Sequence, residues 1–448
     1  MSKKLLNNCV IGLCLCLLGC SSAKVLPKRN AKTLDSLLKE STVFSKSFTG
    51  FMLYDPATKT TLYSQDADKY FTPASNTKIF TLYTATQFLG DSLPLLNYQL
   101  SGDSLIFWGT GNPVFMHPYI PQNDRILNLL KQHEGPLLYS PHNYRDQHFG
   151  PGWAWDDFTY AFQAEKSPFP IHGNVVSFSR DSLQAKNSLT VAPSHFKQQV
   201  RRNPTFYEDS PYFRRKASAN QFEHNLLALT DTSYQIEKPF ITSPKLIAQL
   251  LSDTLRRTVG LSRGNADELT EGKTLYTPFP DTIYQLLMKD SDNFIAEQLL
   301  LMCANQQLGF IETSALIEKA KEDLFADAPD ELLWYDGSGL TRYNMFTPRT
   351  VVSVLEKLLN TFDRQWLFSI FPGGGQAGTI SKWYGNAEKP FVYAKTGTLR
   401  NKHCLSGYLL TDSGKTLIFS FMHNNFPTGS EPLKEEMEKV LSWMKREL

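Results

Sequence analysis

The segment 71–80 places a serine and a lysine three positions apart, Ser75 and Lys78, after two residues that favour a helix start, Thr72 and Pro73. Because positions i and i+3 share a helix face, the Lys78 amine can reach the Ser75 hydroxyl and activate it as a nucleophile. Apolar residues nearly all round the following turns predict that this helix is buried in the middle of its domain. The pattern alone is weak, because Ser-x-x-Lys also occurs at Ser21/Lys24, Ser36/Lys39, Ser194/Lys197 and Ser442/Lys445.

Two other motifs far along the chain supply partners for this pair. Ser291-Asp292-Asn293 stands where one predicted helix ends and another begins. Lys395-Thr396-Gly397 ends an apolar strand and is the sole Lys-Thr-Gly of the sequence. Each motif alone is more typical of a helix cap or a strand end. In this order and context, the set predicts an acyl-transfer site that the fold must assemble from three distant segments.

The residue types fit the parts that acyl transfer needs. Ser75 is the predicted nucleophile and Lys78 its base. Lys78 must be neutral for this role, so we expect burial and the nearby cation Lys395 to lower its pKa. Ser291 can relay a proton between Lys78 and the leaving nitrogen. Asn293 offers an amide that orients Lys78 and a substrate carbonyl.

The last strand supplies the predicted anchor for the substrate. Lys395, with the hydroxyls of Thr396 and Thr398, can hold a carboxylate. Gly397 is expected to let the substrate backbone approach the strand edge closely. The backbone N–H groups of Ser75 and Thr398 are the candidate oxyanion hole.

With its three motifs, the chain resembles the low-molecular-weight class C penicillin-binding proteins, the D-alanyl-D-alanine carboxypeptidase/endopeptidase branch. The resemblance continues at 291–297 and at the polar segment 336–344. The long gap between Lys78 and Ser291 is also typical of that branch, which inserts extra domains there. Class A β-lactamases have a shorter gap and a Glu-x-x-x-Asn loop that is not found in this sequence.

The resemblance implies a serine-type enzyme that cleaves the terminal D-Ala–D-Ala bond of peptidoglycan stem peptides, often together with D-Ala–meso-diaminopimelate cross-links. It also implies that penicillins and other β-lactams acylate Ser75, and that no cofactor is needed. Two alternatives stay open: a serine β-lactamase or esterase, and a catalytically idle wall-binding lipoprotein.

The order of helical and strand-like segments predicts an α+β fold. Strands near 48–54 and 60–64 and three more beyond residue 391 are expected to share an antiparallel sheet flanked by helices, as in the transpeptidase-like domain that the resemblance implies. The predicted division is a signal peptide (1–19), a tether (20–30), a split catalytic domain (31–95 and 239–448) and an inserted β-rich region (96–238).

The N-terminus has the pattern of a lipoprotein leader. Lys3 and Lys4 precede an apolar run at 10–18 that is too short to span a bilayer. Leu17-Leu18-Gly19-Cys20 then resembles the bacterial lipobox, in which Cys20 becomes the lipidated first residue. The following Ser21-Ser22 favours the outer membrane, so the sequence predicts a periplasm-facing lipoprotein of the cell envelope.

Charge and cysteine content exclude other classes. The net charge of +2 comes from Lys3 and Lys4 alone, and the remaining 44 basic and 44 acidic residues balance, which argues against nucleic-acid binding. The nine histidines are scattered without metal-ligand spacing, so no metal site is expected. Beyond Cys20, only Cys303 and Cys404 remain, and they are expected to be unpaired buried thiols.

Overall fold

The computed structural model describes residues 26–180, 188–203, 213–225, 233–264, 272–376, 378–385 and 388–448. The predicted signal peptide, Cys20 and the first part of the predicted tether lie outside these residues. Within the described ranges, no helix is both long and apolar enough to cross a membrane.

The two ends of the chain meet in one antiparallel sheet, as the sequence predicts. Its order is β14-β15-β16-β1-β2, and Phe51 of β1 lies opposite Phe421 of β16. Apolar side chains cover both faces, so helices must pack on each. The strands are β1 (Phe48–Asp55), β2 (Thr60–Gln65), β14 (Val392–Leu399), β15 (Lys402–Leu410) and β16 (Thr416–Asn424).

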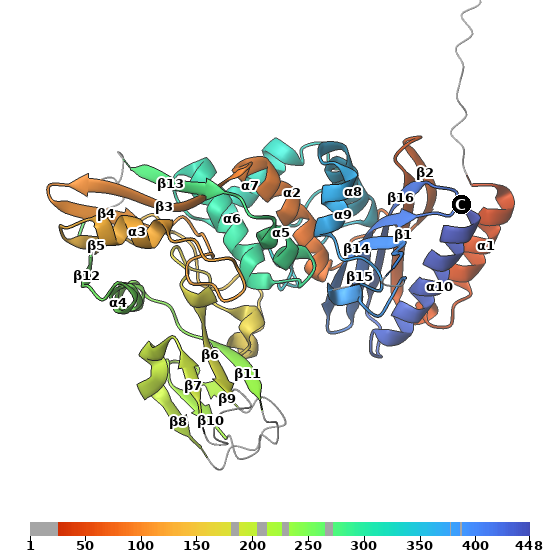
Figure 1. Ribbon diagram of the computed structural model, residues 1–448. Helices are drawn as coiled ribbons and strands as arrows, with labels where there is room; N and C mark the ends of the chain where they lie inside the picture. Colours follow the sequence, from red (N-terminus) through yellow and green to blue (C-terminus); the bar gives the residue numbers. More distant parts are fainter. Residues whose placement is uncertain are drawn as a thin grey trace, which may run out of the picture.

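Helices cover the two faces of this sheet unequally (Figure 1). The first and last helices, α1 (Lys28–Lys39) and α10 (Glu431–Glu447), pack on one face. The other face carries a larger helical layer in which α2 and α6 pack together, and α2 is buried nearly all round, as its composition predicts. This layer contains α2 (Thr77–Leu89), α5 (Asp281–Met288), α6 (Asn293–Leu308), α7 (Thr313–Leu324), α8 (Pro348–Thr361) and α9 (Arg364–Ile370).

A second large sheet, of order β12-β5-β4-β3-β13, lies at the opposite end of the helical layer (Figure 1). Its strands are drawn from both sides of the predicted boundary at residue 239, so the division into domains stays a prediction. They are β3 (Ser92–Ser101), β4 (Ser104–Trp108), β5 (Leu137–Tyr139), β12 (Val259–Leu261) and β13 (Lys273–Pro278), accompanied by α3 (Arg125–Gln132) and α4 (Pro244–Leu255).

Smaller sheets form a lobe that projects from the molecule (Figure 1). One has the order β11-β6-β7 and the other β8-β10-β9. Their strands are β6 (Val175–Arg180), β7 (Thr190–Ala192), β8 (Val200–Arg202), β9 (Phe213–Arg215), β10 (Phe222–His224) and β11 (Tyr234–Pro239). Short 3₁₀ turns connect the larger elements: η1 (Phe44–Lys46), η2 (Ala74–Asn76), η3 (Trp155–Thr159), η4 (Ala161–Gln163), η5 (His172–Asn174), η6 (Ser194–Gln199) and η9 (Gly378–Ile380).

Strand β3 is not anticipated from the sequence. Pro94 lacks an N–H group and normally argues against a central strand. In the structure, the register between β13 and β3 shifts between Leu275 and Tyr276, and Tyr276 lies opposite Pro94. The irregularity therefore accommodates the proline where the ladder would otherwise require its missing donor.

Candidate active site

Ser75 lies in the turn that enters α2, but this entry differs from the prediction. Ala74–Asn76 form the 3₁₀ turn η2, and the α-helix begins only at Thr77, so Thr72 and Pro73 do not cap it. Ala74 adopts a φ of +48°, an uncommon conformation for a residue with a side chain, and the Thr77 hydroxyl donates to the Ala74 carbonyl at 2.8 Å. The residue directly before Ser75 therefore has a backbone conformation that a regular helix start would not give.

The Lys78 amine lies at the meeting point of three segments. Its Nζ is 2.9 Å from Ser75 Oγ, 2.6 Å from Asn293 Oδ1 and 2.7 Å from the carbonyl oxygen of Ser338. The last two are oxygens that can only accept. A neutral amine has two hydrogens, so these two acceptors occupy both and direct the lone pair toward the Ser75 hydroxyl. The geometry therefore fits a base that takes its proton from Ser75.

Burial lowers the pKa of Lys78 to about 8, and three nearby carboxylates limit the effect: Asp336, Asp292 and Glu297. The sequence predicts that Lys395 lowers the pKa of Lys78, but the repulsion between the two lysines lowers the pKa of Lys395 instead. Burial and then repulsion from Lys78 bring the pKa of Lys395 well below its usual value. Because the three carboxylates act on Lys78, Lys395 is the lysine that is more strongly driven to the neutral form.

The Ser291-Asp292-Asn293 motif forms the start of α6. Asp292 caps the helix by accepting from the Ile295 N–H at 2.9 Å, and Ser291 has a φ of +57°. Asn293 is fixed on both sides of its amide: Oδ1 accepts from Lys78, and Nδ2 donates to the Phe162 carbonyl at 3.0 Å. This last contact comes from η4 in the predicted β-rich region, which therefore touches the site directly.

Lys395 points from β14 toward Ser291. Its Nζ donates to Ser291 Oγ at 2.8 Å and to the Thr396 carbonyl at 3.0 Å. The Thr396 hydroxyl donates to Thr379 Oγ1 at 2.7 Å, whereas Thr398 is exposed. The Ser291-Asp292-Asn293 motif therefore contacts both of the others, because Asn293 accepts from Lys78 and Ser291 accepts from Lys395.

Gly397 has a steric role beside the nucleophile. A Cβ at this position would lie 2.3 Å from the Pro73 carbonyl oxygen and 2.9 Å from the Ser75 nitrogen. On the same side, Asn76 Nδ2 donates to the Lys395 carbonyl at 2.8 Å. Gly397 therefore leaves room for the backbone of the turn that contains Ser75. The close approach of the substrate backbone to this strand stays a prediction.

Sequence reasoning did not anticipate the role of the loop 336–342, although it singled out the segment. Asp336 accepts from Trp153 Nε1 at 2.9 Å and from the backbone of Gly339 and Thr341 at 2.9 and 2.8 Å. Glu297 Oε1 accepts from the Ser338 N–H at 2.7 Å. These contacts hold the Ser338 carbonyl at Lys78, and a backbone acceptor leaves no signal in the residue types.

No group of histidines, cysteines and carboxylates among the described residues could hold a metal ion. Cys303 and Cys404 are both buried and free, as the sequence predicts.

A Ser-x-x-Lys pair with a buried lysine, facing a Ser-x-Asn loop and a Lys-Thr-Gly strand on this α+β fold, defines a serine acyl-transfer enzyme of the penicillin-binding class. Residues 30–447 match the D-Ala-D-Ala carboxypeptidase 3 (S13) family, and the chain belongs to that family. The class predicted from the motifs is therefore confirmed.

Two curated relatives have the same type of name. D-alanyl-D-alanine carboxypeptidase DacB of Haemophilus influenzae is 25% identical over 402 residues, which cover 80% of this chain and 81% of the relative. D-alanyl-D-alanine carboxypeptidase of an Actinomadura species is 24% identical over 473 residues, which cover 96% of this chain and 86% of the relative.

The solved structure of penicillin binding protein 4 (dacB) from Haemophilus influenzae confirms the fold. It aligns with a TM-score of 0.72 at 22% identity, over 93% of this chain and 99% of that one. The same protein has also been solved in complex with a β-lactam, where the TM-score is 0.67 at 21% identity over the same shares of the two chains.

Proposed function

We propose that the protein is a serine-type D-Ala-D-Ala carboxypeptidase that works through an acyl-enzyme at Ser75. The observation that carries this proposal is the contact set of Lys78, which leaves its lone pair for the Ser75 hydroxyl. A serine with such a base is an activated nucleophile, and family membership supplies the bond to be cleaved.

In the first half-reaction, Ser75 Oγ attacks the carbonyl carbon of the penultimate D-Ala while Lys78 takes the hydroxyl proton. The backbone N–H groups of Ser75 and Thr398 stabilise the developing oxyanion. As the C–N bond breaks, Ser291 passes a proton to the leaving D-Ala nitrogen and regains one from Lys78. Water then attacks the ester carbonyl and gives a proton to Lys78, which passes it to the departing Ser75 oxygen, so that the shortened peptide and the free serine are released.

The substrate carboxylate is proposed to bind at Lys395 with the Thr396 and Thr398 hydroxyls. Burial and repulsion from Lys78 lower the pKa of Lys395. A substrate carboxylate beside it acts in the opposite direction, so binding favours the ammonium form and gains a charge-assisted contact. Asn293 orients the substrate carbonyl with the amide hydrogen that Phe162 does not use.

The same steps serve a cross-link endopeptidase. In a D-Ala–meso-diaminopimelate bond the leaving amine is also next to a carboxylate, so the anchor at Lys395 is satisfied in the same way. Mass spectrometry of the products from purified sacculi reports the carboxypeptidase and endopeptidase cuts together. Release of D-Ala without loss of cross-linked dimers would restrict the activity to carboxypeptidase.

Localisation is proposed from the leader alone. Cleavage before Cys20 and lipidation of its thiol would anchor the enzyme to the outer membrane, facing the periplasm and its peptidoglycan. Cys20→Ser is expected to abolish labelling with a radioactive fatty acid and to move the protein to the soluble periplasmic fraction. Unchanged labelling would exclude the anchor.

Comparison of two activities tests the assignment against its alternatives. Purified enzyme is expected to release D-Ala from a stem pentapeptide and to hydrolyse the penicillin acyl-enzyme slowly. Fast penicillin turnover with no D-Ala release would indicate a β-lactamase. Folded protein that neither releases D-Ala nor is labelled by penicillin would indicate an idle wall-binding protein.

A further inference from the structure

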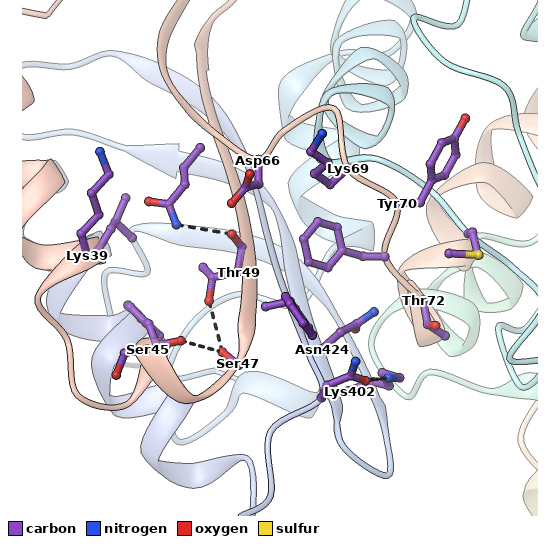
Figure 2. Close-up of a pocket in the computed structure, with 17 residues that line it drawn as sticks. Lys39, Ser45, Ser47, Thr49, Asp66, Lys69, Tyr70, Thr72, Lys402 and Asn424 are labelled. Carbon is purple, nitrogen blue, oxygen red and sulfur yellow. Dashed lines mark hydrogen bonds between the residues drawn. The ribbon is translucent and has the colours of Figure 1, made fainter.

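A cavity of about 740 Å³ lies at one end of the sheet β14-β15-β16-β1-β2 (Figure 2), and no residue of the three catalytic motifs lines it. Its walls come from the end of α1, the start of β1, the end of β2, the segment that leads to Ser75, and the ends of β15 and β16. This volume is within the range of small-molecule sites, about 300–1,000 Å³.

The lining combines ring faces with hydroxyl groups. Phe48 is 67% exposed and Tyr70 is 39% exposed at the cavity. Hydroxyls from Ser45, Ser47 and Thr72 line the same space (Figure 2). Ring faces beside hydroxyl donors and acceptors are what a saccharide requires, since its C–H faces stack and its hydroxyls hydrogen-bond.

Two of the three lysines at the cavity already have acidic partners. Lys39, Lys69 and Lys402 line it from separate elements against one carboxylate, Asp66 (Figure 2). Lys39 is paired with Asp35 at 2.9 Å, and Lys69 is 4.0 Å from Asp68. Both of those acidic residues are outside the lining.

Lys402 is the ammonium group best suited to bind a ligand. It donates to the uncharged amide oxygen of Asn425. Burial lowers its pKa, the nearby Cys404 opposes this effect, and repulsion from Arg342 adds to it. An acidic group placed here would therefore relieve an unfavourable field.

We propose that this cavity binds a carboxylate-bearing saccharide of about disaccharide size, as in muramic acid units that carry no stem peptide, with the carboxylate at Lys402. The choice of the glycan as source rests on the proposed function. The site would hold the strand beside the segment 71–72, close to the nucleophile. It is distinct from the stem-peptide site at Ser75 and Lys395.

The probe is the peptide-free disaccharide of N-acetylglucosamine and N-acetylmuramic acid, titrated calorimetrically into the full chain. N,N′-Diacetylchitobiose, which has similar size and no carboxylate, is the comparison. Lys402→Gln is expected to weaken binding of the muramic acid disaccharide about tenfold. Lys46→Gln is the matched control, because Lys46 is exposed in the neighbouring turn and does not line the cavity.

Titration of penicillin-treated protein separates this site from the catalytic one. Unchanged disaccharide affinity after acylation supports the cavity. Lost affinity after acylation, no binding at all, or equal affinity in Lys402→Gln and wild type would overturn the proposal. A failure of penicillin to label Ser75 would instead count against the proposed function, and the disaccharide titrations would still decide the cavity.

A second inference concerns the residue behind Thr398. On adjacent strands, Thr398 lies directly opposite His403, and His403 Nδ1 is 2.9 Å from Thr398 Oγ1. Burial lowers the pKa of His403 to about 3, so its ring is neutral at physiological pH. His403 Nε2 is buried and has no hydrogen-bond partner among the described residues.

These contacts point to one tautomer. A buried N–H without a partner is rarer and more costly than an unpaired acceptor, so the hydrogen belongs on Nδ1. We infer that His403 donates to Thr398 Oγ1 and is a positioning residue for the proposed substrate carboxylate. Thr398 accepts from the ring, and its own hydrogen stays available to the carboxylate. The opposite tautomer would consume that hydrogen.

Two substitutions separate positioning from packing. His403→Asn keeps an N–H near Nδ1 and is expected to stay within about twofold of wild type, whereas His403→Leu raises KM for a D-Ala-D-Ala peptide about tenfold. An uncharged ester substrate should change little in either. The His403→Leu effect must vanish in a Thr398→Val background, where the hydroxyl is absent. Equal losses on both substrates, or additive losses in the double variant, would overturn the inference, and Thr398→Val alone tests it if His403→Leu does not fold.

Discussion

Lys395 Nζ donates to Ser291 Oγ at 2.8 Å, which joins two motifs that are 104 positions apart. Ser291 therefore stands next to the amine that is most strongly driven to the neutral form. The Ser291 hydroxyl accepts this hydrogen bond, so it can pass on its own hydrogen only in a direction that the bond leaves open. The pair links the proposed carboxylate anchor to the proposed proton relay, so substrate binding and leaving-group protonation depend on the same contact.

Lys395→Ala is expected to weaken carboxylate-bearing substrates most. The variant loses the charge-assisted contact, worth about 1.5–3 kcal/mol or at least tenfold in kcat/KM. An uncharged ester of the same acyl group lacks that contact and should lose less. Steady-state kinetics on the two substrates measure the difference, and an equal loss on both would remove the anchoring role.

Acylation should depend on pH through Lys78. Its pKa is about 8, and the base form is the neutral one. Below that pH the neutral fraction grows about tenfold per unit, so the rate of penicillin acylation should rise with the same slope and level off above pH 8. Stopped-flow labelling across pH 5–10 tests the profile; a rate that falls as pH rises would exclude Lys78 as the base.

Asp336→Asn should shift that profile toward lower pH. Among the carboxylates that raise the pKa of Lys78, Asp336 has the largest effect, so removing its charge should lower that pKa. Trp153→Phe removes the indole donor to Asp336 but keeps the carboxylate charge, and serves as the matched variant. It should leave the midpoint of the profile in place. A common shift in both variants would mean that loop position, and not charge, sets the midpoint.

Gly397→Ala should disrupt the nucleophile turn. The added methyl group would lie 2.3 Å from the Pro73 carbonyl oxygen, so the turn or the strand must move, at a cost of about 1–3 kcal/mol in stability. Gly429→Ala is the control, because nothing lies within 4 Å of its Cβ position. Thermal unfolding and penicillin labelling should both decline in Gly397→Ala alone. Normal labelling there would show that the close approach is not needed.

The sequence was sufficient for the elements whose signal is local and periodic. Short, near-continuous apolar runs define β1 and β16, and the all-round apolar character of α2 requires burial. Strand β3 was not predicted because Pro94 disfavours a strand locally. Its pairing with β13, a long-range interaction, stabilises the strand despite the proline.

The same distinction applies to the site. The motifs identify Ser75, Lys78 and Lys395 by side-chain chemistry, which can be read from residue types. The Ser338 carbonyl and the Phe162 carbonyl act through the backbone, so only the fold shows that they reach Lys78 and Asn293. The direction of the pKa effects also needed the fold, because it depends on which carboxylates surround each lysine.

The most direct test of the central claim is mass spectrometry of penicillin-treated protein. The account predicts one penicilloyl adduct, located by proteolysis on the peptide that contains Ser75 and absent from a folded Ser75→Ala variant. The same Ser75→Ala protein should release no D-Ala from a stem pentapeptide. An adduct on another residue, or D-Ala release that survives Ser75→Ala, would contradict the account.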